Sequence, residues 1–179
     1  MNTETNNTKI ETLISATQIA ARVKELGQQI SQDYKGRPVL ILGTLTGSVI
    51  FLADLVRELD LDVQIDFIKV SSYGAGTESS RQIVEEYLPS WDLVDQNVII
   101  IEDIVDTGHT AKYLFEYLAD KKTASVKMCT LLDKPERREA EGITCHYIGF
   151  TIPNAFVVGY GLDFNQKYRE LPYIGVVTQ

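Results

Sequence analysis

Residues 98–110 read VIIIEDIVDTGHT and contain three carboxylates beside a glycine-containing turn. Glu102 and Asp103 directly follow an apolar run, and Asp106 lies two residues before Gly108. Carboxylates can accept hydrogen bonds from hydroxyl groups, exchange protons or hold a hard cation such as Mg²⁺. A polar turn that opens a helix can bind an anion, because its free N–H groups and the helix dipole are positive there. The segment therefore predicts a ligand with both a phosphate and hydroxyl or metal-binding groups.

The residues on either side of the turn predict the elements that hold it. Residues 98–101 are β-branched and apolar, which is typical of a strand buried on both faces of a parallel sheet. Residues 111–118 have the composition of a helix. Two simpler interpretations stay open: the pair Glu102–Asp103 ends a strand in solvent, or Asp106 only caps the helix.

Helical and strand patterns alternate along the rest of the chain. Amphipathic helices are expected at 17–34 and 48–59, and strands at 39–42, 63–70, 125–132, 143–148 and 155–158. Residues 1–8 are expected to be disordered, 71–90 to form a mobile active-site loop, and the tail after Gly161 to be irregular. This alternation predicts an α/β fold with a central, mainly parallel sheet, in a single domain that spans residues 1–179.

Composition limits the kind of protein. The 179 residues are 44% hydrophobic and 23% charged, with a formal net charge of −8, which argues against a nucleic-acid or membrane binder. Cys129 and Cys145 are far apart, so buried reduced thiols are expected rather than a disulfide or a zinc site. The N-terminus lacks the pattern of a secretory signal, and no apolar run approaches the roughly 20 residues of a membrane span. A cytoplasmic location is expected.

Polar segments follow several of the expected strands. They are residues 43–47, 71–73, 102–110 and 133–134. Since ligands of α/β proteins bind beyond the carboxyl ends of the strands, we expect these four segments to converge on one rim of the sheet.

The acidic motif closely resembles the phosphoribosyl pyrophosphate motif of type I phosphoribosyltransferases. Further segments resemble the bacterial hypoxanthine (guanine) phosphoribosyltransferases: SYG at 72–74, LLDKP at 131–135, FVVGYGLD at 156–163 and YRELPYIG at 168–175. The resemblance implies the type I fold, in which helices flank the sheet and terminal segments form a small hood. It also implies a purine salvage enzyme that transfers phosphoribosyl from phosphoribosyl pyrophosphate to hypoxanthine and guanine, giving IMP or GMP and pyrophosphate.

The resemblance assigns roles to the acidic motif. Glu102 and Asp103 would accept hydrogen bonds from the ribose hydroxyls, and with Asp163 they would serve the Mg²⁺ cofactor. Asp106 would be the general acid/base at purine N7. The 5′-phosphate would bind to the turn formed by Asp106, Thr107, Gly108, His109 and Thr110.

The resemblance extends to the purine and the pyrophosphate. Lys134 would donate to O6 of the base, Phe156 would stack on its ring, and the backbone of Val157 would read its edge. Arg169 would hold pyrophosphate. Taken alone, Lys134 and Arg169 would be surface charges and Phe156 a core residue, so these simpler roles also stay open.

Two loops would complete the site. Ser72 and Tyr73 would close over the ribose and pyrophosphate and exclude water. The first loop would be Leu45, Thr46 and Gly47, with a cis peptide between Leu45 and Thr46. A homodimer or homotetramer is also implied.

The chain departs from the resembled family at two places. Thr46 stands where relatives carry Lys or Arg, and residues 82–86 read QIVEE where relatives often have Asp-x-Lys. These changes favour, as a rival, a binding module that senses phosphoribosyl pyrophosphate or nucleotides without efficient catalysis. A second rival is a phosphoribosyltransferase for another base, such as xanthine or a pyrimidine. The third is a non-enzymatic α/β domain with a plain capping turn.

Overall fold

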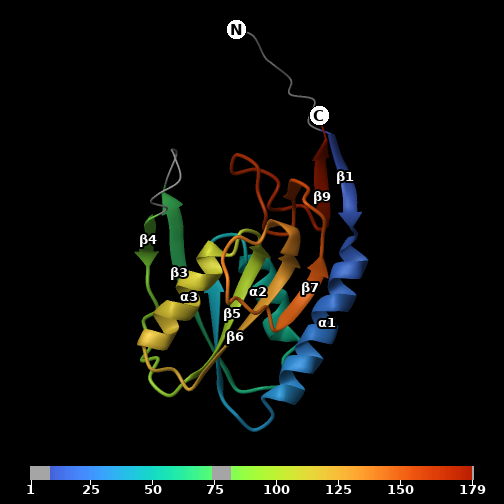
Figure 1. Ribbon diagram of the computed structural model, residues 1–179. Helices are drawn as coiled ribbons and strands as arrows, with labels where there is room; N and C mark the ends of the chain where they lie inside the picture. Colours follow the sequence, from blue (N-terminus) through green and yellow to red (C-terminus); the bar gives the residue numbers. More distant parts are fainter. Residues whose placement is uncertain (1–8, 74–81, 179) are drawn as a thin grey trace.

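The computed structural model describes residues 9–73 and 82–178, with the backbone alone for 71–73 and 82–84. A six-stranded sheet forms the centre of the molecule (Figure 1). Its order is β4-β3-β2-β5-β6-β7, with β2 Val39–Thr44, β3 Val63–Tyr73, β4 Gln82–Tyr87, β5 Asn97–Val105, β6 Ser125–Asp133 and β7 Tyr147–Thr151. Neighbouring strands are parallel except β4, which is antiparallel to β3. The carboxyl ends of the parallel strands therefore meet at one rim.

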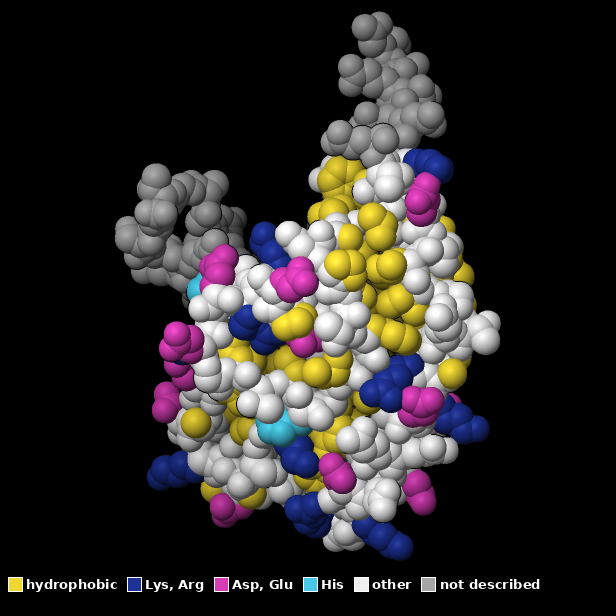
Figure 2. All heavy atoms as spheres, turned by 45° about the vertical axis from the view of Figure 1, so that its right-hand side comes forward, with side chains coloured by type: hydrophobic (Ala, Val, Ile, Leu, Met, Phe, Trp, Pro, Cys, Tyr) yellow, Lys and Arg dark blue, Asp and Glu magenta, His cyan; other side chains and the backbone are white. Residues whose placement is uncertain are grey.

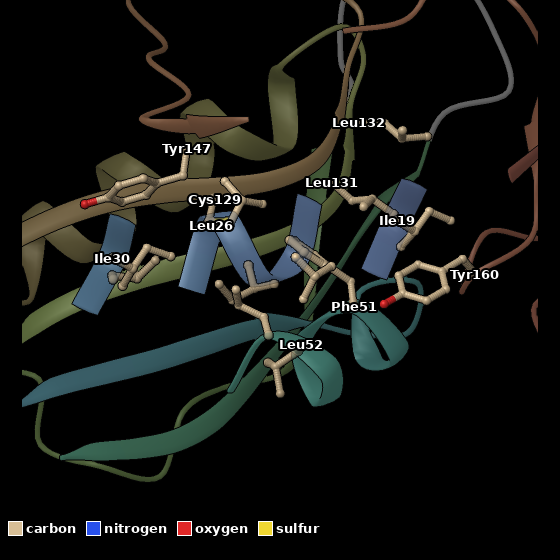
Figure 3. Close-up of a cluster of buried hydrophobic side chains, with 14 of the residues drawn as sticks. Ile19, Leu26, Ile30, Phe51, Leu52, Cys129, Leu131, Leu132, Tyr147 and Tyr160 are labelled. Carbon is tan, nitrogen blue, oxygen red and sulfur yellow. The ribbon is translucent and has the colours of Figure 1, made fainter. Parts of the chain in front are cut away.

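Helices cover both faces of this sheet. The helices α1 (Ala16–Asp33) and α2 (Val49–Arg57) pack on one face, and α3 (His109–Asp120) packs on the other. Side chains alternate along β5, so Ile99 and Ile101 belong to the cluster under α1 and α2, shown in Figure 3. The alternate residues Val98 and Ile100 belong to the cluster under α3. Burial on both faces explains the apolar run.

The longest helix has a clear sequence signal at its start. Ser15 caps α1 and forms a capping box with Gln18, which satisfies N–H groups that the first turn leaves free. One apolar stripe faces the sheet; its buried residues are Ile19, Val23, Leu26 and Ile30. Within the described ranges, no helix is both long and apolar enough to cross a membrane.

A second, three-stranded sheet joins the two ends of the chain. Its order is β1-β9-β8, with β1 Lys9–Ile14, β8 Val157–Val158 and β9 Ile174–Thr178, all antiparallel. Figure 1 shows this hood and the connection between β8 and β9 beside the carboxyl ends of the central strands. The predicted α/β class, with a mainly parallel sheet and a hood of terminal segments, is confirmed.

The tail after Gly161 was expected to be irregular, which is wrong for β9, and β1 was not expected at all. These strands are short, and each pairs with a strand at the opposite end of the sequence, so no local pattern reveals them. The strand expected at 143–148 is displaced: residues 143–146 are irregular and β7 occupies Tyr147–Thr151. Its pairing with β6 begins only at Tyr147.

The segment 71–90, expected to be a loop, contains the end of β3 and all of β4. The two strands pair from Lys69 to Tyr73, with one irregularity after Lys69. The sequence did not predict β4, because the strand contains the adjacent acids Glu85 and Glu86. It is an edge strand, and edge strands tolerate charges that central strands do not. The tip of this segment and residues 1–8 lie outside the described residues, so the mobility and disorder expected there stay predictions.

Candidate active site

The acidic pair lies inside β5, where the sequence had placed it after the strand. Pairing with β6 continues through Glu102 and resumes at Ile104, so the strand extends to Val105. Strand alternation sends the two carboxylates to opposite faces of the sheet. Glu102 lies beside Thr44, whose Oγ1 donates to its Oε2 at 2.7 Å, and Asp103 lies beside Gly47. The pair thus straddles the rim of the sheet and does not merely end in solvent.

Burial controls the charge of these two acids. Glu102 is buried, and loss of solvation raises its pKa well above the ordinary value; the neighbouring charge of Asp103 adds to this, and the Thr44 hydrogen bond opposes it. Burial also raises the pKa of Asp103, against the hydrogen bond that its Oδ1 accepts from the Ile104 N–H at 2.9 Å. A site that raises the cost of negative charge in this way favours ligands that bring hydroxyl donors or cations.

The first loop follows β2 and bends tightly around the acidic pair. The peptide between Leu45 and Thr46 is cis, as the resemblance implied. A Cβ at Gly47 would overlap the carboxylate of Asp103, and a Cβ at Gly161 would overlap the carbonyl oxygen of Gly47. Only glycine therefore fits at these two positions, where the first loop passes between Asp103 and the connection from β8 to β9.

The turn at residues 106–110, here called the phosphate turn, opens α3. Gly108 is the N-terminal cap at φ 88°, a conformation that glycine adopts readily, and no side chain caps the helix. The alternative that Asp106 serves as a helix cap is therefore wrong. The first N–H groups of α3 stay available beside a hollow lined by Glu102, Ile104, Val105, Asp106, Thr107, Gly108, Thr110 and Ala111.

Two cations surround Asp106. Its Oδ1 accepts a hydrogen bond from Arg137 Nε at 3.0 Å, and its Oδ2 lies 3.6 Å from Lys134 Nζ. Lys134 is only 6% exposed and donates to the carbonyl of Ala155 at 2.7 Å, so its interpretation as a solvated surface lysine is wrong. Arg137 lies in the short 3-10 helix Pro135–Arg137 and carries no sequence signal of this contact.

Phe156 is a large apolar side chain, exposed directly before β8. It is 54% exposed, which excludes the core role that its type alone suggests. Phe164 meets it edge-on, with ring centroids 5.4 Å apart and planes at 79°. Val157 is buried in the hood, where it pairs with Val176 of β9. The exposed ring, held by a second aromatic, is suited to stack on a planar ligand.

Asp163 and Arg169 form an ion pair at the rim, with 2.8 Å between Oδ1 and Nη2. Arg169 Nη1 also donates to the carbonyl of Gly161 at 2.6 Å, so the guanidinium is fixed and is not a free surface charge. Both residues line a hollow of about 300 Å³ with the first loop and the acidic pair; its lining is Thr44, Leu45, Thr46, Gly47, Val70, Glu102, Asp103, Ile104, Thr110, Asp163 and Arg169.

This lining confirms that the first loop and the acidic motif converge on one rim. Ser72 and Tyr73 lie in β3, and the structure describes only their backbone, so their roles stay predictions. His109 Nε2 lies 3.0 Å from Glu139 Oε2, which ties the phosphate turn to the segment after the 3-10 helix. Arg137 was missed by the sequence analysis, since only its contact with Asp106 marks it. Thr44 and Gly161 lie within segments that the sequence singled out, but no role was assigned to either residue.

Glu102, Asp103 and Asp163 supply hard oxygen donors around one hollow, as Mg²⁺ requires. In the described part of the chain, no three acidic, histidine or cysteine side chains approach closely enough to form a protein-only metal site. The donor set fits a magnesium ion that keeps waters and is bound in part by the substrate's oxygens. It does not fit a closed structural metal site.

Comparison with known proteins matches this geometry. The model of the phosphoribosyl transferase domain matches residues 10–165. The chain belongs to the phosphoribosyltransferase family. The hypoxanthine-guanine phosphoribosyltransferase of Streptococcus pneumoniae (strain R6) is 46% identical over 167 residues, which cover 93% of this chain and 92% of that protein. The hypoxanthine phosphoribosyltransferase of Escherichia coli (strain K12) is 44% identical over 170 residues, 94% and 95% of the two chains.

The fold of this phosphoribosyltransferase is shared with solved structures. The crystal structure of a hypoxanthine phosphoribosyltransferase from Staphylococcus aureus matches with a TM-score of 0.91 and 44% identity, and covers 97% of this chain and 93% of that one. The similarity therefore includes both the central sheet and the hood. It confirms the family resemblance that the sequence motifs indicated.

Proposed function

We propose that this phosphoribosyltransferase is a purine salvage enzyme that acts on hypoxanthine and guanine. It transfers the phosphoribosyl group of phosphoribosyl pyrophosphate to the base and releases pyrophosphate. One observation carries the proposal: two hollows share the wall formed by Glu102, Ile104 and Thr110. One hollow faces the free N-terminus of α3, and the other faces Arg169 and the first loop.

The two hollows fit the two ends of phosphoribosyl pyrophosphate. The 5′-phosphate binds at the phosphate turn, where backbone N–H groups and the Thr107 and Thr110 hydroxyls donate hydrogen bonds. The pyrophosphate binds in the larger hollow beside Arg169 and the backbone of the first loop. The ribose lies between them, and its hydroxyls donate to Glu102 and Asp103. This placement holds the sugar while its bond to pyrophosphate breaks.

Asp106 is the proton carrier at the purine. Its carboxylate accepts the proton from N7 as the base attacks the ribose, and returns it in the reverse reaction. Its two cationic neighbours, Lys134 and Arg137, hold the carboxylate in place. Lys134 Nζ also donates to O6 of the base, which selects 6-oxopurines over adenine.

The purine lies against the hood. Phe156 stacks on the ring, with Phe164 fixing its orientation, and the backbone of Val157 reads the edge of the base. Ser72 and Tyr73 close over the ribose and exclude water, which would otherwise hydrolyse a cation-like transition state. Lys134, Phe156 and Asp163 together favour a 6-oxopurine, which makes another base class the weaker candidate.

The magnesium ion is part of the proposal. Asp163 would hold it through water, and Glu102 and Asp103 would supply further oxygen donors from the same hollow. When bound, the ion neutralises charge on the departing pyrophosphate. The protein's own contribution to that end of the site is the fixed guanidinium of Arg169 and the backbone of the first loop. A cytoplasmic homodimer or homotetramer is also proposed, on the resemblance alone.

A sensor without efficient catalysis is the second candidate, because Thr46 is exposed in the hollow and carries no charge. Arg169 remains as a cation in the same lining, which favours the enzyme. The test is a spectrophotometric assay with phosphoribosyl pyrophosphate and Mg²⁺, run separately with hypoxanthine, guanine, xanthine, adenine and uracil. Turnover with hypoxanthine and guanine supports the proposal. Binding of phosphoribosyl pyrophosphate without turnover of any base supports the sensor.

A further inference from the structure

The phosphate turn rests on a strip of chain that follows β6. The N–H groups of Glu139 and Ala140 both donate to the carbonyl of Thr107 at 3.0 Å. Upstream, the Lys134 N–H donates to the carbonyl of Val105, also at 3.0 Å. Residues 134–140 are therefore hydrogen-bonded to the backbone on both sides of Asp106, at the end of β5 and in the turn.

One arginine of this strip lies directly against the cap of α3. A Cβ placed on Gly108 would meet Cδ of Arg138 at 2.7 Å and Cδ1 of Ile143 at 2.5 Å. The same point lies 3.4 Å from Arg138 Nε. The guanidinium of Arg138 therefore packs against the cap residue, and side chains fill the space beneath it.

Arg138 is a largely buried cation. Its side chain is 20% exposed, and Nη2 is bonded to the carboxylate of Asp133 at the end of β6. Among the described residues, Nε of Arg138 has no hydrogen-bond partner. A buried donor without a partner is costly and needs an explanation. Packing alone does not supply one, because an apolar chain of similar length would fill the same space without that cost.

We infer that Arg138 is a positioning residue for the 5′-phosphate of the substrate. It holds the phosphate turn from beneath through Gly108, and its charge adds positive potential to the N–H groups that face the phosphate. The inference deepens the proposed function and rests on it. A cation behind an anion-binding helix N-terminus strengthens that site, and partial burial reduces the screening of its charge by water.

The test compares ligands with and without the 5′-phosphate. Binding of IMP and of inosine is measured for the wild type, Arg138→Met and Arg138→Lys. Arg138→Met keeps the length of the chain and loses the charge, so IMP binding is expected to weaken by about tenfold or more, while inosine binding changes less than about twofold. Arg138→Lys is expected to restore most of the preference for IMP.

Asp133→Asn gives the opposite change of charge. It removes the negative partner and leaves Arg138 in place, so the preference for IMP over inosine is expected to rise. This variant also keeps the inference testable where Arg138→Met folds poorly. A loss of preference in both variants would mean that the pair acts only through packing, and would overturn the inference.

A partly buried arginine elsewhere provides the control. Arg22 in α1 donates to the backbone carbonyls of Gly149 at 3.0 Å and Ile148 at 2.8 Å, on the α1 side of the sheet. Arg22→Met is expected to lower Tm and to leave the IMP-to-inosine ratio unchanged. Equal weakening of IMP and inosine in Arg138→Met would overturn the inference. A wild type that bound no IMP would overturn the proposed function and this inference with it.

Discussion

The backbone of Gly47 passes so close to Asp103 that a methyl group at position 47 would occupy the place of the Asp103 carboxylate. The first loop and the acidic pair are therefore in direct steric contact, although 54 residues of sequence lie between Gly47 and Glu102. On the other side, the connection from β8 to β9 reaches the Gly47 carbonyl at Gly161. Gly47 therefore lies in close contact with two other segments of the site, one on each side.

Gly47→Ala is expected to reduce kcat/KM for phosphoribosyl pyrophosphate by about 10²-fold. The added methyl group would displace the Asp103 carboxylate, and a shift of about 1 Å is enough to lose its alignment with the substrate. Steady-state kinetics at fixed hypoxanthine would measure this. Gly36→Ala is the control for loss of a glycine, since nothing lies within 4 Å of a Cβ at Gly36, where the φ of 74° alone makes alanine unfavourable. The control is expected to lose some stability and keep its activity. Equal losses of activity in the two variants would contradict the role given to Gly47.

Asp106→Asn is expected to keep the fold and the binding of IMP, and to lower kcat by about 10²–10⁴-fold, the usual contribution of a general acid/base. The asparagine still accepts a hydrogen bond from Arg137 but cannot take the proton from N7. Single-turnover rates with hypoxanthine would separate chemistry from product release. Asp92→Asn, on an exposed residue, is the control for the change of charge. Unchanged turnover in Asp106→Asn would remove the acid/base assignment.

How far the sequence predicts this molecule depends on whether the pattern is local. The run 98–101, the glycine turn and α3 are contiguous, so strand, turn and helix were all placed correctly within a few residues. The cis peptide at Leu45–Thr46 followed from the family resemblance alone. In contrast, β1 and β9 pair the two ends of the chain, and that pairing leaves no periodic signal in either segment.

In the site, too, residues in a local motif were predicted from the residue pattern, and residues whose roles depend on long-range contacts were not. Lys134 looks like a surface lysine until β6, the 3-10 helix and the carbonyl of Ala155 enclose it. Arg137 and Arg138 are adjacent in sequence, yet one contacts Asp106 and the other packs beneath Gly108. Residue type and spacing cannot distinguish two neighbouring arginines, because their roles depend on the direction in which a short helix turns. The acids Glu102, Asp103 and Asp106 were predicted because they stand close together in one contiguous motif.

Thr46→Lys tests the missing cation of the first loop. The exposed position lines the hollow with Asp163 and Arg169, so a lysine there is expected to lower KM for phosphoribosyl pyrophosphate. A partly exposed charge pair contributes about 1 kcal/mol, which corresponds to about a fivefold change. Initial rates over a range of phosphoribosyl pyrophosphate would show it, with Thr46→Gln as the uncharged control. No difference between lysine and glutamine would mean that the loop acts through its backbone.

Glu102→Gln tests whether burying the Glu102 carboxylate lowers the free energy of unfolding. Because burial raises the pKa of Glu102, the folded protein keeps a proton there that the unfolded chain loses above about pH 4.3. The folded state then binds more protons than the unfolded state, so this group's contribution to stability falls as the pH rises towards the folded pKa. The glutamine variant lacks this term and can still accept the Thr44 hydrogen bond.

The variant is therefore expected to match the wild type near pH 4 and to become the more stable protein as the pH rises, by about 1.4 kcal/mol for each unit of pKa difference. Denaturant unfolding in EDTA between pH 4 and pH 9 would give both curves without interference from a bound cation. Glu58→Gln, on an exposed acid that caps the C-terminus of α2, is the control and should follow the wild type. Parallel curves for Glu102→Gln and the wild type would show that the buried acid carries no such cost.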